Sequence, residues 1–256
     1  MASFDLTGRV ALVTGGSRGL GRATVLAFAA AGADVVIASR KLDDCQAVAE
    51  EVEALGRKAL PHACHVGRWN ELDGLIATTY ETFGRVDVLV NNAGMSPLYD
   101  RVENVSEELW RKVIDVNLSG PFRLTATIGA RMAAGDGGSI INVSSVAARY
   151  PLPEVIPYAA AKAGLDALTV GFAHAFGPAV RVNSVQPGTF LTDVSKHWDM
   201  DAFERESQGF ALQRGASADE LEGTMLYLAS DASTYTTGAV LRVDGGYLPP
   251  QRSGRS

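Results

Sequence analysis

A tyrosine and a lysine four residues apart, Tyr158 and Lys162, have the types and spacing that acid–base chemistry needs. They lie in an alanine-rich stretch that favours a helix, where a spacing of four places both side chains on one face. A free phenol has a pKa of about 10 and is a poor acid or base at neutral pH. Because a nearby ammonium favours the phenolate, we expect Lys162 to lower the pKa of Tyr158 and to make it a proton donor and acceptor.

A serine, Ser145, lies thirteen residues before Tyr158 and directly follows an apolar run, Gly138–Ser144. We predict that this run is a strand. Ligands of open parallel sheets bind beyond the carboxyl ends of the strands, so we expect Ser145 in the same site as Tyr158.

A glycine-rich turn joins the first predicted strand, Arg9–Thr14, to a helix that begins near Gly19. Gly15, Gly19 and Gly21 permit a tight turn and a close backbone approach, and the helix N-terminus presents free N–H groups to a pyrophosphate. The turn therefore predicts a dinucleotide site. Its other expected cofactor contacts are Ser17, Arg18 and Leu20.

Short β-branched runs alternate with longer alanine-rich stretches along the whole chain. This alternation predicts an α/β fold, doubly wound, with seven parallel strands and helices on both faces. We expect one domain over residues 1–256, with an insertion at about 189–217. The predicted strands are Arg9–Thr14, Asp34–Ser39, Lys58–Cys64, Val86–Asn91, Gly138–Ser144, Arg181–Val185 and Val240–Val243. The predicted helices are Gly19–Ala31, Leu42–Gly56, Asn70–Phe83, Ser106–Ala133, Pro157–Phe176 and Ala218–Ser230.

Composition excludes several classes of protein. The formal net charge of −6 argues against nucleic acid as a partner. Two cysteines, Cys45 and Cys64, cannot form a disulfide framework, and no histidine–cysteine cluster has metal-ligand spacing, so we expect no metal. The chain lacks an apolar run of the roughly 18 residues that span a membrane. Its first residues also lack the segments of a signal peptide, so we expect a cytoplasmic protein without a membrane partner.

The ordered motifs of this chain resemble those of the short-chain dehydrogenase/reductase family, over nearly its whole length. The type is the Tyr-x-x-x-Lys one of carbonyl reductases and alcohol dehydrogenases. This resemblance implies a Rossmann fold, an NAD(P)(H) cofactor and a homotetramer, with a dimer as the alternative. The motifs that carry it are Thr14-Gly15-x-x-x-Gly19-x-Gly21, Asn91-Asn92-Ala93-Gly94, Asn117, Ser145, Tyr158-x-x-x-Lys162, Pro187-Gly188 and Asp244-Gly245-Gly246.

The resemblance also implies roles for the catalytic residues. Tyr158 would exchange a proton with the substrate oxygen, Ser145 would orient and polarise that oxygen, and Lys162 would hold the nicotinamide ribose. Ser144 would be the structural neighbour of Ser145, and Asn117 is the fourth catalytic member.

Asn117 also has a reason of its own. Pro121 has no N–H, so in a regular helix through both residues the Asn117 carbonyl loses its usual i+4 partner. That carbonyl could hold a water that passes protons toward Lys162. An ordinary proline kink beside Gly120 is the alternative.

Further cofactor contacts are implied beyond the ends of the later strands. The segment from Asn91 to Gly94 would pass close to the adenosine, and the segment after Pro187 would hold the nicotinamide end. There we expect Phe190 to bind through its backbone and Thr192 through its hydroxyl, whereas Asp244 is expected to close a turn. The expected cofactor residues outside the glycine turn are Ser39, Arg40, His65, Val66, Asn92, Ala93, Gly94, Tyr158, Lys162, Pro187, Gly188, Phe190 and Thr192.

The end of the second predicted strand indicates which dinucleotide is used. An NAD site would place a carboxylate there for the ribose hydroxyls, but this chain has Ser39 followed by Arg40. A guanidinium matches a phosphate bidentately, and Arg18 should face the same region. We therefore predict a preference for NADP(H), with NAD(H) possible. In the alternative, Arg18, Arg40 and Lys41 are solvated surface charges.

One position departs from the family pattern. After the third strand the family usually carries Asp-Val, whose carboxylate receives the adenine amino group, and this chain has His65-Val66. A neutral imidazole can accept one hydrogen bond, so the contact could survive in altered form. A surface histidine is the alternative.

The insertion carries many apolar side chains, which could form a lid over a ligand or only anchor the segment. With Met95, Pro97, Val146, Leu152 and Pro153 they suggest an apolar pocket for a ketone or a secondary alcohol. Lys196, His197 and Arg205 could instead meet an anionic group, and the residues do not decide between these. The apolar residues of the insertion are Phe190, Leu191, Val194, Trp198, Met200, Phe203, Phe210 and Leu212.

The sequence thus predicts an oxidoreductase that interconverts a ketone or aldehyde and an alcohol with NADP(H). Two alternatives are a 3-oxoacyl-carrier-protein reductase and an NAD-dependent sugar or polyol dehydrogenase. A third, outside the enzymes, is a dinucleotide-sensing regulator, against which the complete set of four catalytic residues argues.

Overall fold

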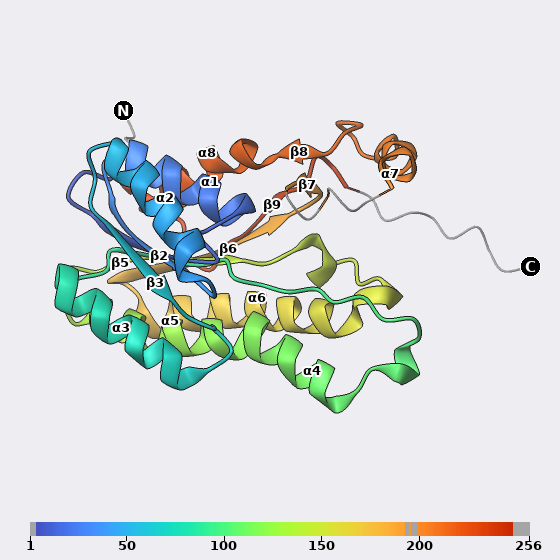
Figure 1. Cartoon of the computed structure of the whole chain (residues 1–256), viewed down its shortest axis with the longest axis horizontal. Helices are drawn as coiled ribbons and strands as arrows, with labels where there is room; N and C mark the ends of the chain where they lie inside the picture. The colour runs from blue at the N-terminus through green and yellow to red at the C-terminus, as the bar shows by residue number, and fades with distance from the viewer. Residues whose placement is uncertain (1–3, 193–194, 196–198, 248–256) are drawn as a thin grey trace, which may run out of the picture.

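Seven parallel strands form the centre of the molecule, in the order β3-β2-β1-β4-β5-β6-β9 (Figure 1). This computed structural model describes residues 4–192, 195 and 199–247. The chain runs outward from β1 to β3 on one side and from β4 to β9 on the other, so the strand order reverses between β1 and β4. The strands are β1 (Val10–Thr14), β2 (Asp34–Ser39), β3 (Ala59–Ala63), β4 (Val88–Asn91), β5 (Gly138–Val143), β6 (Val180–Pro187) and β9 (Val240–Val243).

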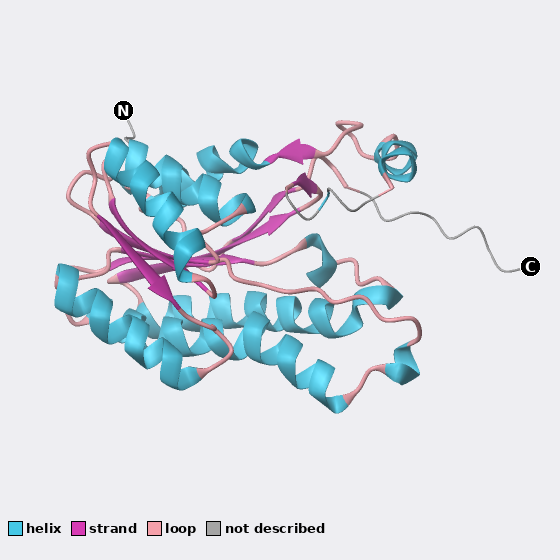
Figure 2. Ribbon diagram, viewed as in Figure 1, coloured by secondary structure: helices cyan, strands magenta, loops and turns pink. Residues whose placement is uncertain are grey.

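Helices cover both faces of this sheet (Figure 2). On one face lie α1 (Gly19–Ala30), α2 (Leu42–Ala54) and α8 (Glu222–Ala229). On the other lie α3 (Trp69–Phe83), α4 (Glu107–Ile114), α5 (Gly120–Ala133) and α6 (Ile156–Phe176). The predicted doubly wound Rossmann fold with seven parallel strands is therefore confirmed.

Burial explains the continuous apolar strands. Successive side chains of a strand point to opposite faces, and in β1 Ala11 and Val13 enter the core under α1 while Val10 and Leu12 enter the core under α3 and α5. All five residues of β1 are buried. A strand covered on both sides has no polar face to alternate with.

One predicted helix is interrupted. The expected Ser106–Ala133 helix consists of α4, a π-helical turn over Asp115–Ser119, and α5. Gly120 closes the turn by donating its N–H to the Asp115 carbonyl, and Pro121 follows with no N–H to give. Periodicity could not reveal the extra residue in this turn.

No helix in the described ranges is long and apolar enough to cross a bilayer.

The insertion has structure of its own. It holds β7 (Phe190–Leu191) and β8 (Ala216–Ser217), which pair as a small parallel sheet, and between them α7 (Met200–Ser207), at the right of Figure 1. The insertion, for which we predict no strand or helix, thus contains regular secondary structure in this part. Four of the residues that we expected near the substrate lie outside the described residues. These are Val194, Lys196, His197 and Trp198.

Candidate active site

One threonine, Thr14, joins the end of β1 to the segment after β4, at the point where the strand order reverses. The Thr14 hydroxyl, at the end of β1, accepts the backbone N–H groups of Asn92 at 3.0 Å and Ala93 at 3.1 Å, and donates to the Val90 carbonyl at 3.2 Å. The Asn92 amide in turn donates to the Thr14 carbonyl at 2.9 Å. These bonds fix the glycine turn against the Asn-Asn-Ala-Gly segment, and thus shape the place where doubly wound sheets bind ligands.

The glycine turn has no room for side chains at its closest point. A Cβ built on Gly21 would lie 2.1 Å from the Gly15 carbonyl oxygen. Next to the turn, the Ser17 hydroxyl donates to the Ser39 hydroxyl at 2.9 Å and so links the turn to the end of β2. The backbone at Gly21 therefore approaches the backbone at Gly15 as closely as a tight glycine turn requires.

A cleft of about 710 Å³ runs from this turn across the ends of β2, β4, β5 and β6. All the residues that we predicted for the cofactor line it, from Gly15 to Thr192, and so does Ser145. Asn117 does not line it, because it is fully buried. The cleft wall also contains residues that no sequence motif predicts as cofactor contacts: Ala38, Cys64, Met95, Ser96, Pro97, Lys112, Val116, Val143, Ser144 and Thr189.

The wall of this cleft suits an extended dinucleotide. At its centre a Cβ on Gly94 would lie 3.0 Å from the Asn117 Oδ1 atom and 3.6 Å from the Lys162 Nζ atom, so only a glycine leaves this part of the cleft open. Backbone N–H groups at the N-terminus of α1 suit the pyrophosphate. Residues at both ends are of the types that hold an adenosine and a nicotinamide ribose.

Lys162 reaches the cleft from α6 and is almost completely buried. Its Nζ atom donates to the Val143 carbonyl at 2.7 Å and lies 5.7 Å from the ring centroid of Tyr158. Burial lowers the pKa of Lys162 to about 8, and the negative charge of Asp166 acts in the opposite direction. A buried lysine whose pKa lies this far below its ordinary value is unusual, and such groups gather at functional sites.

Tyr158 does not show the pKa that we expected. Burial raises its pKa above the ordinary value, and a hydrogen bond with Ser145 lowers it by less. The expectation that Lys162 lowers this pKa is therefore wrong here. The reason is geometric, because the ammonium lies over the face of the ring and bonds to the Val143 carbonyl instead of the phenol oxygen.

The two adjacent serines have different partners. Ser144 is buried and donates its hydroxyl to the Lys162 carbonyl at 3.2 Å, so it ties the end of β5 to α6. Ser145 is half-buried, accepts the Ala147 N–H at 3.1 Å and bonds to Tyr158. Of the two, Ser145 is the one beside the phenol, as the spacing predicts.

Asn117 lies inside the π-helical turn, and its side chain is fully engaged. Its Oδ1 atom accepts the Met95 N–H at 3.2 Å, and its Nδ2 atom donates to the Met95 and Val113 carbonyls at 2.9 Å each. The argument from Pro121 assumed a regular helix, whereas Asn117 lies in a π-helical turn that Gly120 closes by donating its N–H to the Asp115 carbonyl. The free Asn117 carbonyl stays a prediction.

A tyrosine outside the cleft wall caps α6, the helix that carries Tyr158 and Lys162. No side chain of its own caps the N-terminus of α6. Instead the Tyr99 hydroxyl accepts the Ile156 N–H at 2.9 Å and donates to the Pro153 carbonyl. Tyr99 thereby connects the loop after β4 to the first turn of the helix that carries Tyr158, a contact for which the sequence has no signal.

His65 lines the cleft beyond the end of β3. Its Nδ1 atom accepts the Gly67 N–H at 3.2 Å, so that nitrogen already has a partner. The contact of His65 with adenine stays a prediction.

The end of the cleft beyond β2 carries positive charge. Arg18 and Arg40 line it, and Lys41 follows. Within the described part of the chain, none of the three forms an ion pair, whereas Arg22 and Arg57 nearby are paired with Glu51 and Asp34. This end of the cleft therefore carries guanidinium groups without an acidic partner among the described residues.

The described part of the insertion is anchored to the end of the chain. Phe210 is buried with its ring centroid 5.2 Å from that of Tyr247, and Leu212 donates its N–H to the Gly245 carbonyl at 2.9 Å. Asp244 accepts the Gly246 N–H at 3.0 Å and so closes this turn, as predicted. The anchoring interpretation holds for Phe210, whereas Leu212 is 62% exposed.

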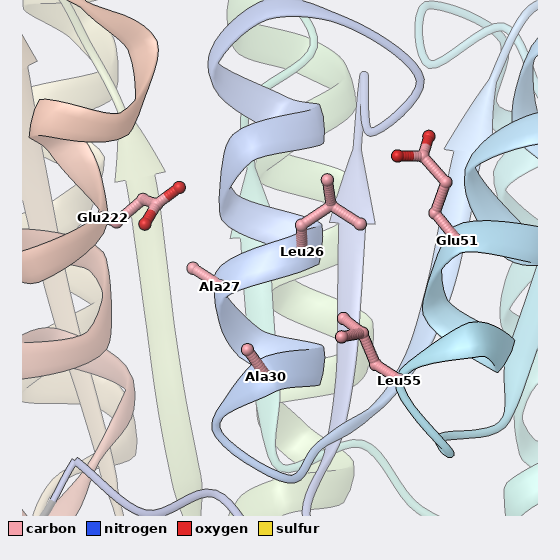
Figure 3. Close-up of a pocket in the computed structure, with 6 residues that line it drawn as sticks. All are labelled: Leu26, Ala27, Ala30, Glu51, Leu55 and Glu222. Carbon is pink, nitrogen blue, oxygen red and sulfur yellow. The ribbon is translucent and has the colours of Figure 1, made fainter.

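A second hollow, of about 390 Å³, lies over the outer face of α1 (Figure 3). The carboxylates of Glu51 and Glu222 lie on either side of the helix, with Leu26 and Leu55 between α1 and α2. Its charged groups are both acidic, so it does not suit a phosphate. Among the described residues there is also no group of three or more histidine, cysteine or acidic side chains placed to hold a metal.

Comparison with known proteins identifies the class. The family model described as short chain dehydrogenase matches residues 9–202. A 3-oxoacyl-[acyl-carrier-protein] reductase of Thermotoga maritima is 37% identical over 246 residues, with 95% of this chain and 99% of that protein covered. An L-rhamnose 1-dehydrogenase (NAD(P)(+)) of Azotobacter vinelandii is 39% identical, with 94% and 97% covered. The solved structure of an NADPH-dependent 3-quinuclidinone reductase from Rhodotorula rubra superposes with a TM-score of 0.88 at 31% identity, covering 95% of this chain and 92% of that one.

The chain therefore belongs to the short-chain dehydrogenase family. It is an oxidoreductase that acts on a CH–OH or carbonyl group with a nicotinamide dinucleotide.

Proposed function

We propose that this enzyme reduces a ketone or aldehyde to an alcohol with NADPH, or catalyses the reverse oxidation, as a carbonyl reductase. The observation that carries the proposal is the convergence of Tyr158, Ser145 and Lys162 on the cleft that begins at the glycine turn. When bound, the dinucleotide supplies or accepts the hydride. The chain then has to bind the carbonyl oxygen and move one proton.

Each catalytic side chain has a task in this proposal. In reduction, the Tyr158 hydroxyl gives its proton to the substrate oxygen, and Ser145, which bonds to that hydroxyl, orients the same oxygen. Lys162 holds the nicotinamide ribose with its ammonium. Asn117 fixes the loop after β4 through Met95 and so keeps the floor of the cleft open beside Gly94.

The substrate class is open to a direct test. Ketones, aldehydes and alcohols are screened by absorbance at the reduced-nicotinamide band, together with an oxoacyl thioester of acyl carrier protein and a set of sugars. Simple ketones should be turned over best. A clear preference for the thioester or for a sugar would favour the activities named for the two relatives, and dinucleotide binding without any turnover would favour a regulator.

We further propose a preference for NADP(H), which Ser39, Arg18 and Arg40 support. Hydrogen bonds to charged groups contribute about 1.5–3 kcal/mol. Replacing Arg40 by alanine should therefore raise the KM for NADPH about 10- to 100-fold and leave the KM for NADH nearly unchanged.

Steady-state kinetics with both coenzymes measures this effect. The control is Arg22→Ala, because Arg22 lies outside the cleft wall and is paired with Glu51. Equal catalytic efficiency with both coenzymes in the unmodified enzyme, unaffected by Arg40→Ala, would show that the positive charges are only surface groups.

We also propose a homotetramer built through α4, α5 and α6. These helices expose large apolar side chains, between 39% and 43% accessible, at Trp110, Phe122, Ile156 and Val170. A second copy could bury them across a two-fold axis. Light scattering should give the mass of four chains of 27.0 kDa. A dimer would restrict the interface to one axis, and a stable monomer would contradict the proposal.

The two buried free cysteines support a cytoplasmic location.

A further inference from the structure

Asp166 lies one helical turn after Lys162 on α6 and joins that helix to β6. Its Oδ1 atom accepts the Ser184 hydroxyl at 2.7 Å, and its Oδ2 atom accepts the Gln186 side-chain amide at 2.7 Å. Ser184 and Gln186 are alternate residues of β6, so their side chains point to the same face of the sheet. Both are buried. One carboxylate therefore holds two consecutive side chains of one face of the strand.

The position of this contact matters for the cleft. Gln186 is followed directly by Pro187 and Gly188, which line the nicotinamide part of the cleft, and Lys162 lines it from α6. Asp166 thus connects the two elements that face each other across the coenzyme ribose. A shift of α6 along β6 would move Lys162 relative to Pro187.

Asp166 also provides a negative charge on the helix that carries Lys162. Among the described residues, Lys162 forms no ion pair. The groups that face its side chain are the Tyr158 ring on α6, the Val143 carbonyl at the end of β5 and, across Gly94, the Asn117 amide of the π-helical turn. These groups are uncharged at neutral pH. The Asp166 carboxylate therefore supplies the negative charge on the same helix.

We propose that Asp166 is a positioning residue of the active site, which holds α6 in register with the end of β6 and places a negative charge one turn from the Lys162 ammonium. The inference rests on the proposed reduction reaction. It assigns Asp166 two effects, a mechanical one through Ser184 and Gln186 and an electrostatic one through Lys162. Two variants separate them.

The first variant, Asp166→Asn, removes the charge but can keep both contacts. The asparagine oxygen can accept from Gln186, and its NH2 group can donate to the Ser184 hydroxyl, which also accepts hydrogen bonds. The negative charge opposes the loss of the proton from Lys162, so without it the ammonium is lost at a lower pH. The alkaline limb of kcat/KM for reduction should move to lower pH by roughly 0.5–1 unit.

The second variant, Ser184→Ala, keeps the charge but removes one contact. Here the alkaline limb should stay in place, while the KM for NADPH rises a few-fold because the end of β6 is less well held. Asp73→Asn is the control, since Asp73 is an exposed acid on α3 outside the cleft wall. Its pH profile should match that of the unmodified enzyme.

A binding measurement distinguishes failure of the inference from failure of the proposed function. Fluorescence titration with NADPH between pH 7 and 9 should show affinity falling at a lower pH in Asp166→Asn than in the unmodified enzyme. This titration needs no turnover, so it tests the role of Asp166 even if the protein reduces no carbonyl. Superimposable binding and pH–rate profiles for Asp166→Asn and the unmodified enzyme would overturn the inference.

Discussion

Replacing Tyr158 by phenylalanine should lower kcat for carbonyl reduction by about 10²–10⁴-fold, the range that a positioned acid–base group contributes. The substitution removes only the hydroxyl. The ring that lies beneath the Lys162 ammonium remains, and Lys162 keeps its bond to the Val143 carbonyl. Because these contacts remain, the affinity for NADPH should stay within about threefold of the unmodified value. A change of that size corresponds to well under 1.4 kcal/mol.

Single-turnover kinetics and fluorescence titration together test this prediction. The matched control is Tyr80→Phe, since Tyr80 is a half-buried tyrosine on α3 under the guanidinium of Arg131 and outside the cleft wall. Its kcat should change little. Near-normal turnover by Tyr158→Phe would remove the tyrosine from the proton path, and loss of NADPH binding would mean that the phenol shapes the coenzyme site instead.

Much of the site could be predicted because its residues lie at the ends of strands. The alternation of strands and helices fixes a parallel sheet, and such a sheet brings the carboxyl ends of all its strands to one edge. Thr14, Asn92, Ser145 and Pro187 are far apart in the chain, yet each follows or ends a predicted strand. Their meeting in one cleft needs no knowledge of individual side-chain contacts.

Other features depend on contacts that no local pattern encodes. The Tyr99 hydroxyl caps α6 from a loop more than fifty residues away, and Asp166 reads in the sequence as an ordinary polar residue of a helix. The pKa of Tyr158 rises because burial outweighs the hydrogen bond from Ser145, a balance set by the packed cleft. Nor does the sequence show that the Gly67 N–H donates to the Nδ1 atom of His65.

Replacing Gly21 by alanine should weaken coenzyme binding and destabilise the free protein at the same time. The added Cβ would lie 2.1 Å from the Gly15 carbonyl oxygen and 2.5 Å from the Asn92 side-chain amide, so the turn or α1 must move. Overpacking of this kind costs about 1–3 kcal/mol, and the displaced backbone is the part that would hold the pyrophosphate. The Kd for NADPH should rise about 10- to 100-fold, with a lower melting temperature of the free protein.

Gly74→Ala is the matched control for this substitution. Gly74 also lies within a helix, α3, but a Cβ there would meet nothing within 4 Å. Alanine is favoured over glycine in helix interiors by about 0.5–1 kcal/mol, so this variant should melt at the same or a slightly higher temperature and bind NADPH normally. Calorimetry and fluorescence titration of both variants give the comparison. If Gly21→Ala behaved like Gly74→Ala in both measurements, the glycine turn would have room that its packing denies, and the coenzyme would have to bind without a close approach to Gly15.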